Sequence, residues 1–228
     1  MANEPYSGVE NLEIMQEAEN YNRYLLNTVL RHAPAGARVL DFGAGNGEFA
    51  VPLSAQGFNL VAVEPDDFLR RGLGERGVTA ASSTSGLANA SFDYVYTLNV
   101  LEHIEDHEAA LRQLHDKLKP GGRLLIYVPA FPILYSSMDA RVGHIRRYTR
   151  RGLVAIVKAA GFDVATVAYV DSLGFLATLV FKWLGSKDGG VNRTALKAYD
   201  RAVFPLSRLL DFITRRWFGK NLLLLATR

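Results

Sequence analysis

The chain has 228 residues, of which 49% are hydrophobic and 21% are charged, as expected of one globular domain with a full apolar core. It has no cysteine, which excludes disulfides, thiolate nucleophiles and cysteine-ligated zinc, and its formal charge at pH 7 is only +3. The N-terminal residues MANEPYSGVE are too polar for a signal peptide, and the longest apolar runs fall far short of the roughly 20 residues of a membrane span. These features predict a cytoplasmic protein.

Helical and strand-like patterns follow one another along the chain. Between Leu12 and Val29, apolar residues recur at helical spacing and predict one or two amphipathic helices within residues 1–37. From residue 38 to about 170, short apolar runs alternate with amphipathic segments, the pattern of crossover units in a parallel sheet. The predicted strands are residues 38–42, 59–64, 77–81, 92–98, 123–128, 162–170 and 221–227. The predicted helices between them are residues 48–56, 67–75, 106–118 and 149–161, with a stop and turn at 119–122.

A glycine-rich turn, VLDFGAGNGEF at residues 39–49, follows the first predicted strand. A dinucleotide loop has the spacing G-x-G-x-x-G, but here the third glycine position holds Glu48, whose charge would repel a pyrophosphate. Glu64 ends the next predicted strand about 20 residues later, the usual distance to an acid that binds ribose hydroxyls. A ribose-binding acid without a pyrophosphate loop favours a nucleoside without phosphates, such as S-adenosylmethionine.

Four ordered motifs carry a family resemblance. VLDFGAGNG, VAVEPD (61–66), SFDYVYTLNVLEHIED (91–106) and LKPGGRLLIYVP (118–129) resemble those of class I S-adenosylmethionine-dependent methyltransferases over residues 38 to about 170. The resemblance implies an α/β fold: a Rossmann-like, seven-stranded sheet with helices on both faces and an antiparallel last strand. It also implies S-adenosylmethionine as cofactor and S-adenosylhomocysteine as product. The cofactor-binding residues that it implies are Asp41, Gly43, Ala44, Gly45, Asn46, Glu64, Pro65 and Asn99.

A narrower similarity rests on NYNRYL (20–25) combined with VGHIRRYTRRGL (142–153), which resemble a bacterial subgroup of these enzymes associated with surface-sugar or lipid-linked pathways. By this similarity Tyr21 and Tyr24 close over the cofactor, although their helical spacing suits simple core residues equally well. The family often places an acid after its third strand to bind adenine, whereas this chain has serines there. A serine hydroxyl such as that of Ser83, or backbone carbonyls, would then bind the adenine.

The segment DARVGHIRRYTRR, residues 139–151, places five arginines around one histidine on the ligand side of the predicted sheet. The alternative is a solvated basic loop ahead of a helix. For an oxygen or nitrogen acceptor, His144 or His103 is the predicted general base, because histidine titrates near neutral pH; a carboxylate or an acidic phenol needs no base. The predicted substrate-binding residues are Tyr135, Arg146, Arg147 and Tyr148.

His103 and His107 have the spacing of two zinc ligands on one helix. However, Asp106 is the predicted N-cap of the helix, which leaves His103 in the preceding loop. No third ligand is evident, so we expect no metal site. Asp93 begins a predicted strand and is therefore expected to be structural.

Residues 172–220 form a long connection between the last two predicted strands, where similar methyltransferases have a short hairpin. This connection combines leucines and aromatic residues with nine lysines and arginines against three aspartates, a net charge of +6. Two helical patterns are predicted, over 173–184 and 194–218. Basic amphipathic helices with tryptophan favour contact with a membrane surface. The alternative is a helical cap that packs on the sheet or on a second subunit, and nucleic acid is a weaker third.

The sequence thus predicts one domain made of N-terminal lid helices (1–37), a cofactor-binding core (38–171), a helical insertion (172–220) and a last strand (221–228). The predicted function is methyl transfer from S-adenosylmethionine to an oxygen or nitrogen atom of a small-molecule, lipid-linked or sugar-linked acceptor. The alternative is a catalytically silent, S-adenosylmethionine-binding subunit that regulates a partner, and a dehydrogenase is a distant third. The predicted location is the cytoplasm, including the inner face of the membrane, and a homodimer remains open.

Overall fold

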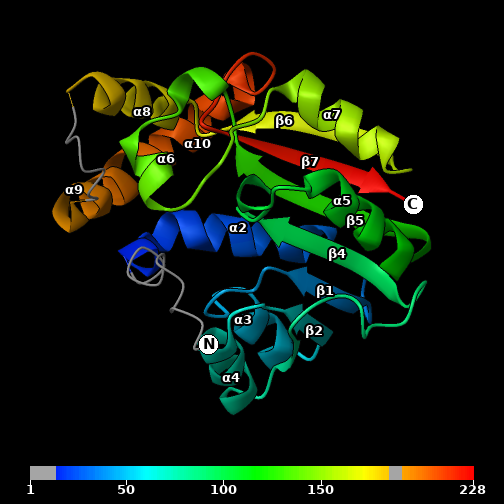
Figure 1. Ribbon diagram of the computed structural model, residues 1–228. Coiled ribbons are helices and arrows are strands. Elements are labelled where there is room, and N and C mark those ends of the chain that lie inside the picture. The colour runs from blue at the N-terminus through cyan, green and yellow to red at the C-terminus, as the bar shows by residue number, and fades with distance from the viewer. Residues whose placement is uncertain (1–13, 185–191) are drawn as a thin grey trace.

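The computed structural model describes residues 14–184 and 192–228, which form one seven-stranded sheet with surrounding helices (Figure 1). The strand order is β3 (Thr79–Ala81), β2 (Asn59–Val63), β1 (Arg38–Phe42), β4 (Phe92–Leu98), β5 (Leu118–Pro129), β7 (Asn221–Thr227) and β6 (Asp163–Val170). Paired strands are parallel except at β7, which runs antiparallel to both β5 and β6. The predicted fold class, with its antiparallel last strand, is confirmed.

Helices cover both faces of the sheet (Figure 1). Successive side chains of a strand point to opposite faces, so Val39 and Leu40 of β1 belong to two different apolar clusters. The cluster of Val39 includes residues of α2 (Glu19–His32), α3 (Ala50–Ala55) and α4 (Asp67–Glu75). The cluster of Leu40 includes residues of α5 (His107–Lys117) and α7 (Arg150–Ala159). Because the helices occupy both faces, the loops at the carboxyl ends of the parallel strands are the natural place for a site.

In the described part of the chain, three α-helices lie between β6 and β7. They are α8 (Ser172–Leu184), α9 (Arg193–Ala198) and α10 (Phe204–Thr214), and a π-helical turn, η3 (Tyr199–Val203), joins α9 to α10. These helices gather at one end of the sheet, near α2 (Figure 1). The helical pattern predicted over 194–218 is therefore interrupted by the π turn and ends at Thr214. Leu12, Lys187 and Asp188, which contribute to the predicted helical spacing and charge, lie outside the described residues.

Several predicted boundaries are wrong by a few residues. Helix α3 begins at Ala50 rather than at residue 48, because the turn of the glycine loop continues through Phe49. Strand β2 ends one residue early, and β3 begins two residues late. The largest error concerns β5, which begins at Leu118 and absorbs the turn predicted at 119–122. Leu118 pairs with Phe92, and the backbone of Gly121 and Gly122 hydrogen bonds to Arg228, so these residues form an irregularity within the strand rather than a turn before it.

Two aspartates hold the elements together as the sequence predicts. Asp106 is the N-cap of α5, and its side chain accepts a hydrogen bond from the backbone N–H of Ala109 at 2.8 Å. Asp93 accepts hydrogen bonds from the backbone N–H of Arg38 at 2.8 Å and from the ammonium group of Lys119 at 2.6 Å. Asp93 therefore joins β1, β4 and β5 near the starts of β1 and β4, away from the strand ends that carry the site.

Candidate active site

The glycine loop has a backbone that only glycine tolerates at its first turn. Gly43 has a φ of +85°, and a Cβ built there would lie 2.3 Å from Cγ2 of Val100. The backbone N–H groups of Gly43 and Ala44 both donate to the carbonyl oxygen of Val63, at 2.9 and 3.1 Å. The loop is thus pinned to the end of β2, which brings it next to the acid that follows that strand.

Glu64 lies directly against the glycine loop, as the sequence predicts. One carboxylate oxygen accepts a hydrogen bond from the backbone N–H of Gly45 at 2.7 Å, and the other accepts from the N–H of Asp66 at 2.9 Å. The residue is buried, and this burial raises the pKa of the carboxyl group above its usual value. Pro65 is exposed beside it, and its carbonyl oxygen accepts a hydrogen bond from Arg70 at 3.0 Å.

Asp41 lies below the loop, within the sheet. It is buried and accepts a hydrogen bond from the hydroxyl of Tyr96 at 2.8 Å. Burial, together with the nearby charge of Glu64, raises the pKa of Asp41 to about 7 despite that hydrogen bond. Asn46 is on the outer side of the loop, where its side-chain oxygen accepts from the N–H of Glu48 at 3.3 Å. Asp41 therefore links β1 to β4 through Tyr96, and its predicted role in cofactor binding stays a prediction.

Asn99 and Tyr21 meet at the end of β4. Asn99 has a φ of +54°, and its side-chain amide donates to the hydroxyl of Tyr21 at 3.3 Å. The ring of Tyr21 packs edge-on against Tyr127 and Phe204, with centroid distances of 6.2 and 5.5 Å. Tyr24 also packs against Phe204 of α10, and the guanidinium of Arg208 is 3.9 Å from its ring centroid. The structure therefore brings Tyr21 into contact with Asn99, another predicted site residue.

The insertion holds the helix that carries Tyr21. Asp200 of η3 is buried, and its carboxylate accepts hydrogen bonds from the backbone N–H groups of Asn20 and Tyr21, each at 2.9 Å. An anion that satisfies free amides at a helix N-terminus stabilises that end of the helix. Asp200 therefore acts as an N-terminal cap of α2 supplied by a distant part of the chain, a role that local sequence patterns could not reveal.

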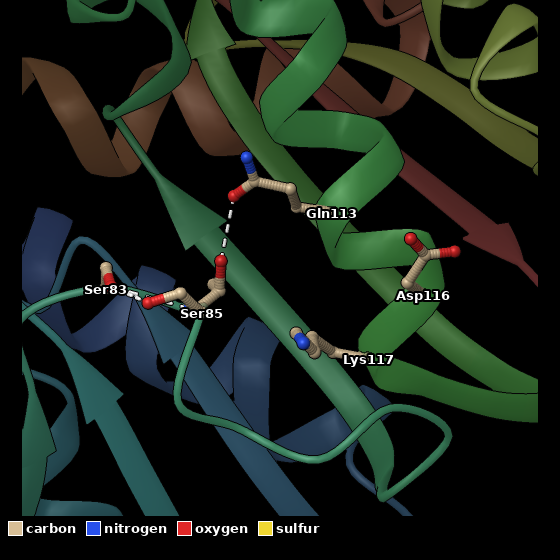
Figure 2. Close-up of a pocket in the computed structure, with 6 residues that line it drawn as sticks. Ser83, Ser85, Gln113, Asp116 and Lys117 are labelled. Atoms are coloured by element: carbon tan, nitrogen blue, oxygen red, sulfur yellow. Dashed lines mark hydrogen bonds between the residues drawn. The ribbon is translucent and has the colours of Figure 1, made fainter.

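Ser83 lines a separate surface hollow of about 370 Å³, together with Thr84, Ser85, Gln113, Asp116 and Lys117 (Figure 2). Its hydroxyl lies 2.8 Å from that of Ser85, and the hydroxyl of Thr84 donates to Gln113 of α5 at 2.8 Å. These partners belong to the loop after β3 and to α5 rather than to the glycine loop. The predicted role of Ser83 in adenine binding stays a prediction.

Asp139 organises the loop after β5. This loop contains η2 (Pro132–Leu134) and α6 (Ser137–Arg141). One oxygen of Asp139 lies 2.8 Å from Nδ1 of His144 and accepts from Nε of Arg147 at 2.8 Å, while the other accepts from the N–H of Ser136 at 2.9 Å. Burial alone would raise the pKa of Asp139, but the hydrogen bonds from His144 and Arg147 outweigh it and hold the pKa at about 2. Asp139 is therefore an anion at every physiological pH.

The two predicted bases lie side by side. The rings of His103 and His144 meet edge to face with a centroid distance of 4.8 Å, and Nε2 of His144 is 3.7 Å from the carboxylate of Glu102. Burial raises the pKa of Glu102 to about 8. Burial and the neighbouring His144 lower the pKa of His103 to about 4, although a hydrogen bond to Gly143 opposes the shift. Sequence reasoning missed both Glu102 and Asp139. The S-x-x-D spacing of a capping box at 136–139 was a signal for Asp139.

The remaining predicted substrate residues use their polar groups within the fold. Tyr135 donates to the carbonyl oxygen of His144 at 2.6 Å, and Tyr148 donates to that of Leu101 at 3.0 Å. Arg147 is buried on Asp139, and Arg146 donates to the carbonyl oxygen of Glu105 at 3.0 Å. These contacts fasten the 139–151 loop against the loop after β4, which places His144 beside His103. A direct contact of these four residues with an acceptor stays a prediction.

Comparison with known proteins places this arrangement in a family. The sequence profile of the methyltransferase domain family matches residues 15–167, more than half of the chain. An uncharacterized protein of Mycobacterium tuberculosis is 26% identical over 133 residues, which cover 53% of this chain and 45% of that protein. A ubiquinone biosynthesis O-methyltransferase of Xanthomonas axonopodis is 36% identical over 106 residues, or 42% of this chain and 44% of that enzyme. The chain thus spans less than half the length of these curated relatives.

A solved structure extends the likeness to the whole fold. A methyltransferase of Thermotoga maritima, described as S-adenosylmethionine-dependent and as a possible histamine N-methyltransferase, superposes with a TM-score of 0.66 at 18% identity. The superposition covers 96% of this chain and 94% of that one, so the likeness includes the helices outside the matched family segment. The sheet order and the glycine loop agree with membership of a methyltransferase family. The chain belongs to the methyltransferase domain family, because the family's sequence profile matches more than half of it.

Proposed function

We propose that this chain is an S-adenosylmethionine-dependent methyltransferase that acts on an oxygen or nitrogen atom of a small-molecule, lipid-linked or sugar-linked acceptor. The cofactor supplies a methyl group already activated by the sulfonium centre, so the protein has mainly to bind and orient the two reactants. The glycine loop allows close approach of the backbone to the cofactor, and Glu64 accepts hydrogen bonds from the ribose hydroxyls. Asn99 and Tyr21 lie at the adjoining strand end, beside the amino-acid part.

The residues of the loop fit this cofactor better than a dinucleotide. Glu64 offers two carboxylate oxygens that accept hydrogen bonds from ribose hydroxyls, which either ligand would provide. The carboxylate already accepts from Gly45, so the loop and the acid form one continuous binding edge. Glu48 adds a second negative charge beside the loop, where a pyrophosphate would lie. The charge pattern therefore supports a cofactor with a cationic sulfonium and an ammonium group.

Helices α8 and α10 supply the observation that carries our choice of acceptor. On α10 the polar residues Ser207 and Asp211 are buried, whereas Leu209 and Phe212 are 73% and 78% exposed. On α8, Thr178 is buried and Trp183 is 79% exposed. The other large apolar side chains exposed on these helices and just after α10 are Leu176, Val180, Leu206, Leu210, Ile213 and Trp217. We call this set of nine residues the apolar face. An exposed apolar surface of this kind marks an interaction site.

The inward orientation of the polar residues has a local cause. The carboxylate of Asp211 accepts hydrogen bonds from the backbone N–H groups of Asp171 and Ser172, at 2.8 and 2.9 Å. The hydroxyl of Ser207 accepts from the N–H of Leu173 at 2.9 Å. These three amides lie at the start of α8 and have no partner within the helix itself. Because Asp211 and Ser207 accept hydrogen bonds from these amides, the polar side of α10 faces the protein and its apolar side faces outward.

A membrane surface with anionic lipids is the partner that fits the apolar face. Two tryptophans belong to this face, and the exposed cations Lys182, Arg215 and Arg216 adjoin them in sequence. Aromatic and leucine side chains can enter the headgroup region while arginine and lysine pair with anionic lipids. In the described ranges, no helix has both the length and the apolar character needed to cross a membrane. We therefore propose peripheral binding that brings a lipid-linked acceptor to the site.

Sedimentation with vesicles tests this proposal. The full chain should sediment with vesicles that contain phosphatidylglycerol, and less with phosphatidylcholine alone, because the cations contribute. The triple change Leu209→Ser, Phe212→Ser and Trp217→Ser should weaken binding at least tenfold, since burying each such side chain contributes roughly 1.5–3 kcal/mol. Phe68→Ser is the matched control, because Phe68 is 65% exposed on α4, outside the apolar face. A stable dimer that binds no vesicles would instead assign the apolar face to a second copy of the chain.

Turnover separates the enzyme from a silent regulatory subunit. Both would bind S-adenosylhomocysteine, but only the enzyme would transfer label from S-adenosylmethionine to acceptors in a lipid extract. Absence of labelled product with every extract fraction, despite cofactor binding, would favour the regulatory subunit.

A further inference from the structure

Three side chains with metal-binding groups meet at the carboxyl ends of β4 and β5. Glu102 and His103 belong to η1 (Leu101–His103), which follows β4, and His144 lies in the loop after α6. One potential ligand atom from each side chain lies within 4.8 Å of the others. The sequence alone predicts no metal, because no third ligand is evident for His103 and His107 and His103 lies in the loop before the helix. The fold brings His144, from a distant loop, beside Glu102 and His103. Three potential ligands therefore lie together although the sequence shows no such set.

Both histidines are anchored through the same ring nitrogen. Nδ1 of His103 lies 3.1 Å from the carbonyl oxygen of Gly143, and Nδ1 of His144 lies 2.8 Å from the carboxylate of Asp139. A carbonyl oxygen and an ionised carboxylate can only accept hydrogen bonds, so each Nδ1 carries the proton. Each Nε2 then has a lone pair, which is the usual arrangement of metal-binding histidines whose other nitrogen donates to an acceptor.

Glu102 is the member of this cluster that points most strongly to a bound cation. Its side chain is fully buried, and neither carboxylate oxygen has a hydrogen-bond partner among the residues that the structure describes. An ionised carboxylate that is buried without a partner is strongly destabilising. The imidazole of His144 faces this carboxylate, with its Nε2 3.7 Å from Oε1 of Glu102. A cation bound between these two groups would stabilise the ionised form of the Glu102 carboxylate and accept the lone pair of His144 Nε2.

We propose that Glu102, His103 and His144 bind a divalent cation of the zinc type. Two imidazole nitrogens and one carboxylate are the ligand set of many catalytic zinc sites, which keep a fourth position open for water or substrate. Magnesium and calcium prefer oxygen ligands and fit this set poorly. Zinc bonds of 2.0–2.1 Å require ligand atoms roughly 3.4 Å apart, so binding draws the three side chains closer together.

A cation at this position changes the role expected of the two histidines. They would hold the metal through Nε2 and would not themselves be the base. The cation would act as a Lewis acid and make a hydroxyl acceptor more acidic. This inference goes beyond the proposed methyl transfer and does not depend on the membrane contact.

Cobalt titration tests the site without relying on activity. The full chain, prepared without a histidine tag and treated with a chelator, is titrated with Co²⁺ while visible absorption is recorded. We expect one Co²⁺ per chain, with the intense bands of four-coordinate cobalt, and displacement by one equivalent of Zn²⁺. Glu102→Gln and His144→Ala should each weaken Co²⁺ binding at least tenfold, because each removes one of three ligands.

His115→Ala is the matched control, since His115 lies on α5 outside the cluster and should leave the affinity unchanged. Circular dichroism of each variant shows whether the fold survives. Equal Co²⁺ binding by wild type and Glu102→Gln, or no stoichiometric binding by wild type, would overturn the proposal. S-adenosylhomocysteine binding is measured on the same chelator-treated protein. If the protein binds S-adenosylhomocysteine but not Co²⁺, the metal site is refuted and the proposed methyl transfer is not.

Discussion

Replacement of Gly43 by alanine tests whether the first turn of the glycine loop requires a residue without a Cβ. The new Cβ would lie 2.3 and 2.7 Å from the two γ-carbons of Val100, far inside van der Waals contact. The φ of +85° adds a conformational cost of roughly 1–2 kcal/mol for any residue with a Cβ. Overpacking typically adds about 1–3 kcal/mol. The sum predicts a loss of about 2–5 kcal/mol in the free energy of unfolding.

Two further variants separate the two parts of that cost. Gly57 has a φ of +84° but no atom within 4 Å of the position that a Cβ would take, so Gly57→Ala should lose only the conformational part, about 1–2 kcal/mol. Val100→Ala removes the clashing methyl groups and should partly rescue Gly43→Ala in a double-mutant cycle. The assay is urea unfolding followed by circular dichroism. Equal losses for Gly43→Ala and Gly57→Ala, or no rescue by Val100→Ala, would refute the steric argument.

The remaining predictions concern three buried polar contacts. The folded-state pKa of Asp41 is raised to about 7 from an unfolded value near 3.9, so its contribution to stability is complete below pH 3.9 and is lost as the pH rises through 7. Between pH 5 and pH 8 the free energy of unfolding of the wild type should fall by about 3 kcal/mol more than that of Asp41→Asn. Urea unfolding that gives parallel pH profiles for the two proteins would contradict this. Asp200→Ala should cost about 0.5–2 kcal/mol, like the loss of other helix caps, and should weaken S-adenosylhomocysteine binding through Tyr21. Asp106→Ala removes a comparable cap from α5 and should leave that affinity unchanged in calorimetry. Tyr21→Phe keeps the ring contacts and loses only the hydroxyl that accepts from Asn99, so it should unfold like the wild type within about 1 kcal/mol yet bind S-adenosylhomocysteine more weakly.

The cofactor side of the site is largely local in sequence, which is why it could be predicted. The glycine loop and Glu64 each end a strand, and paired parallel strands bring their ends together without further information. The strands β1, β4 and β7 were predicted with their observed bounds, because each is a compact apolar run with clear flanking residues. Errors arose where the backbone departs from a simple pattern, as at the irregularity within β5 and the π turn between α9 and α10.

The acceptor side depends on contacts between distant segments. His103 and His144 were found separately as titratable residues, but their proximity depends on hydrogen bonds such as those of Tyr135 and Tyr148, which no periodicity encodes. Glu102 was missed because its sequence context is that of an ordinary acid beside a histidine, and its burial follows only from the packing of η1 under the 139–151 loop. For α10 the sequence left open whether the apolar side faces outward or packs on the sheet, because a helical pattern does not show which side faces the protein.

Calorimetric titration with S-adenosylhomocysteine tests the central claim most directly, because the claim rests on Glu64 and the glycine loop as one cofactor-binding edge. We predict that the wild type binds one equivalent per chain and that Glu64→Ala binds at least tenfold more weakly, since it loses charge-assisted hydrogen bonds to the ribose of about 1.5–3 kcal/mol each. Glu75→Ala, at the end of α4, is the control and should bind like the wild type. No binding by the wild type, or equal binding by wild type and Glu64→Ala, would contradict the account.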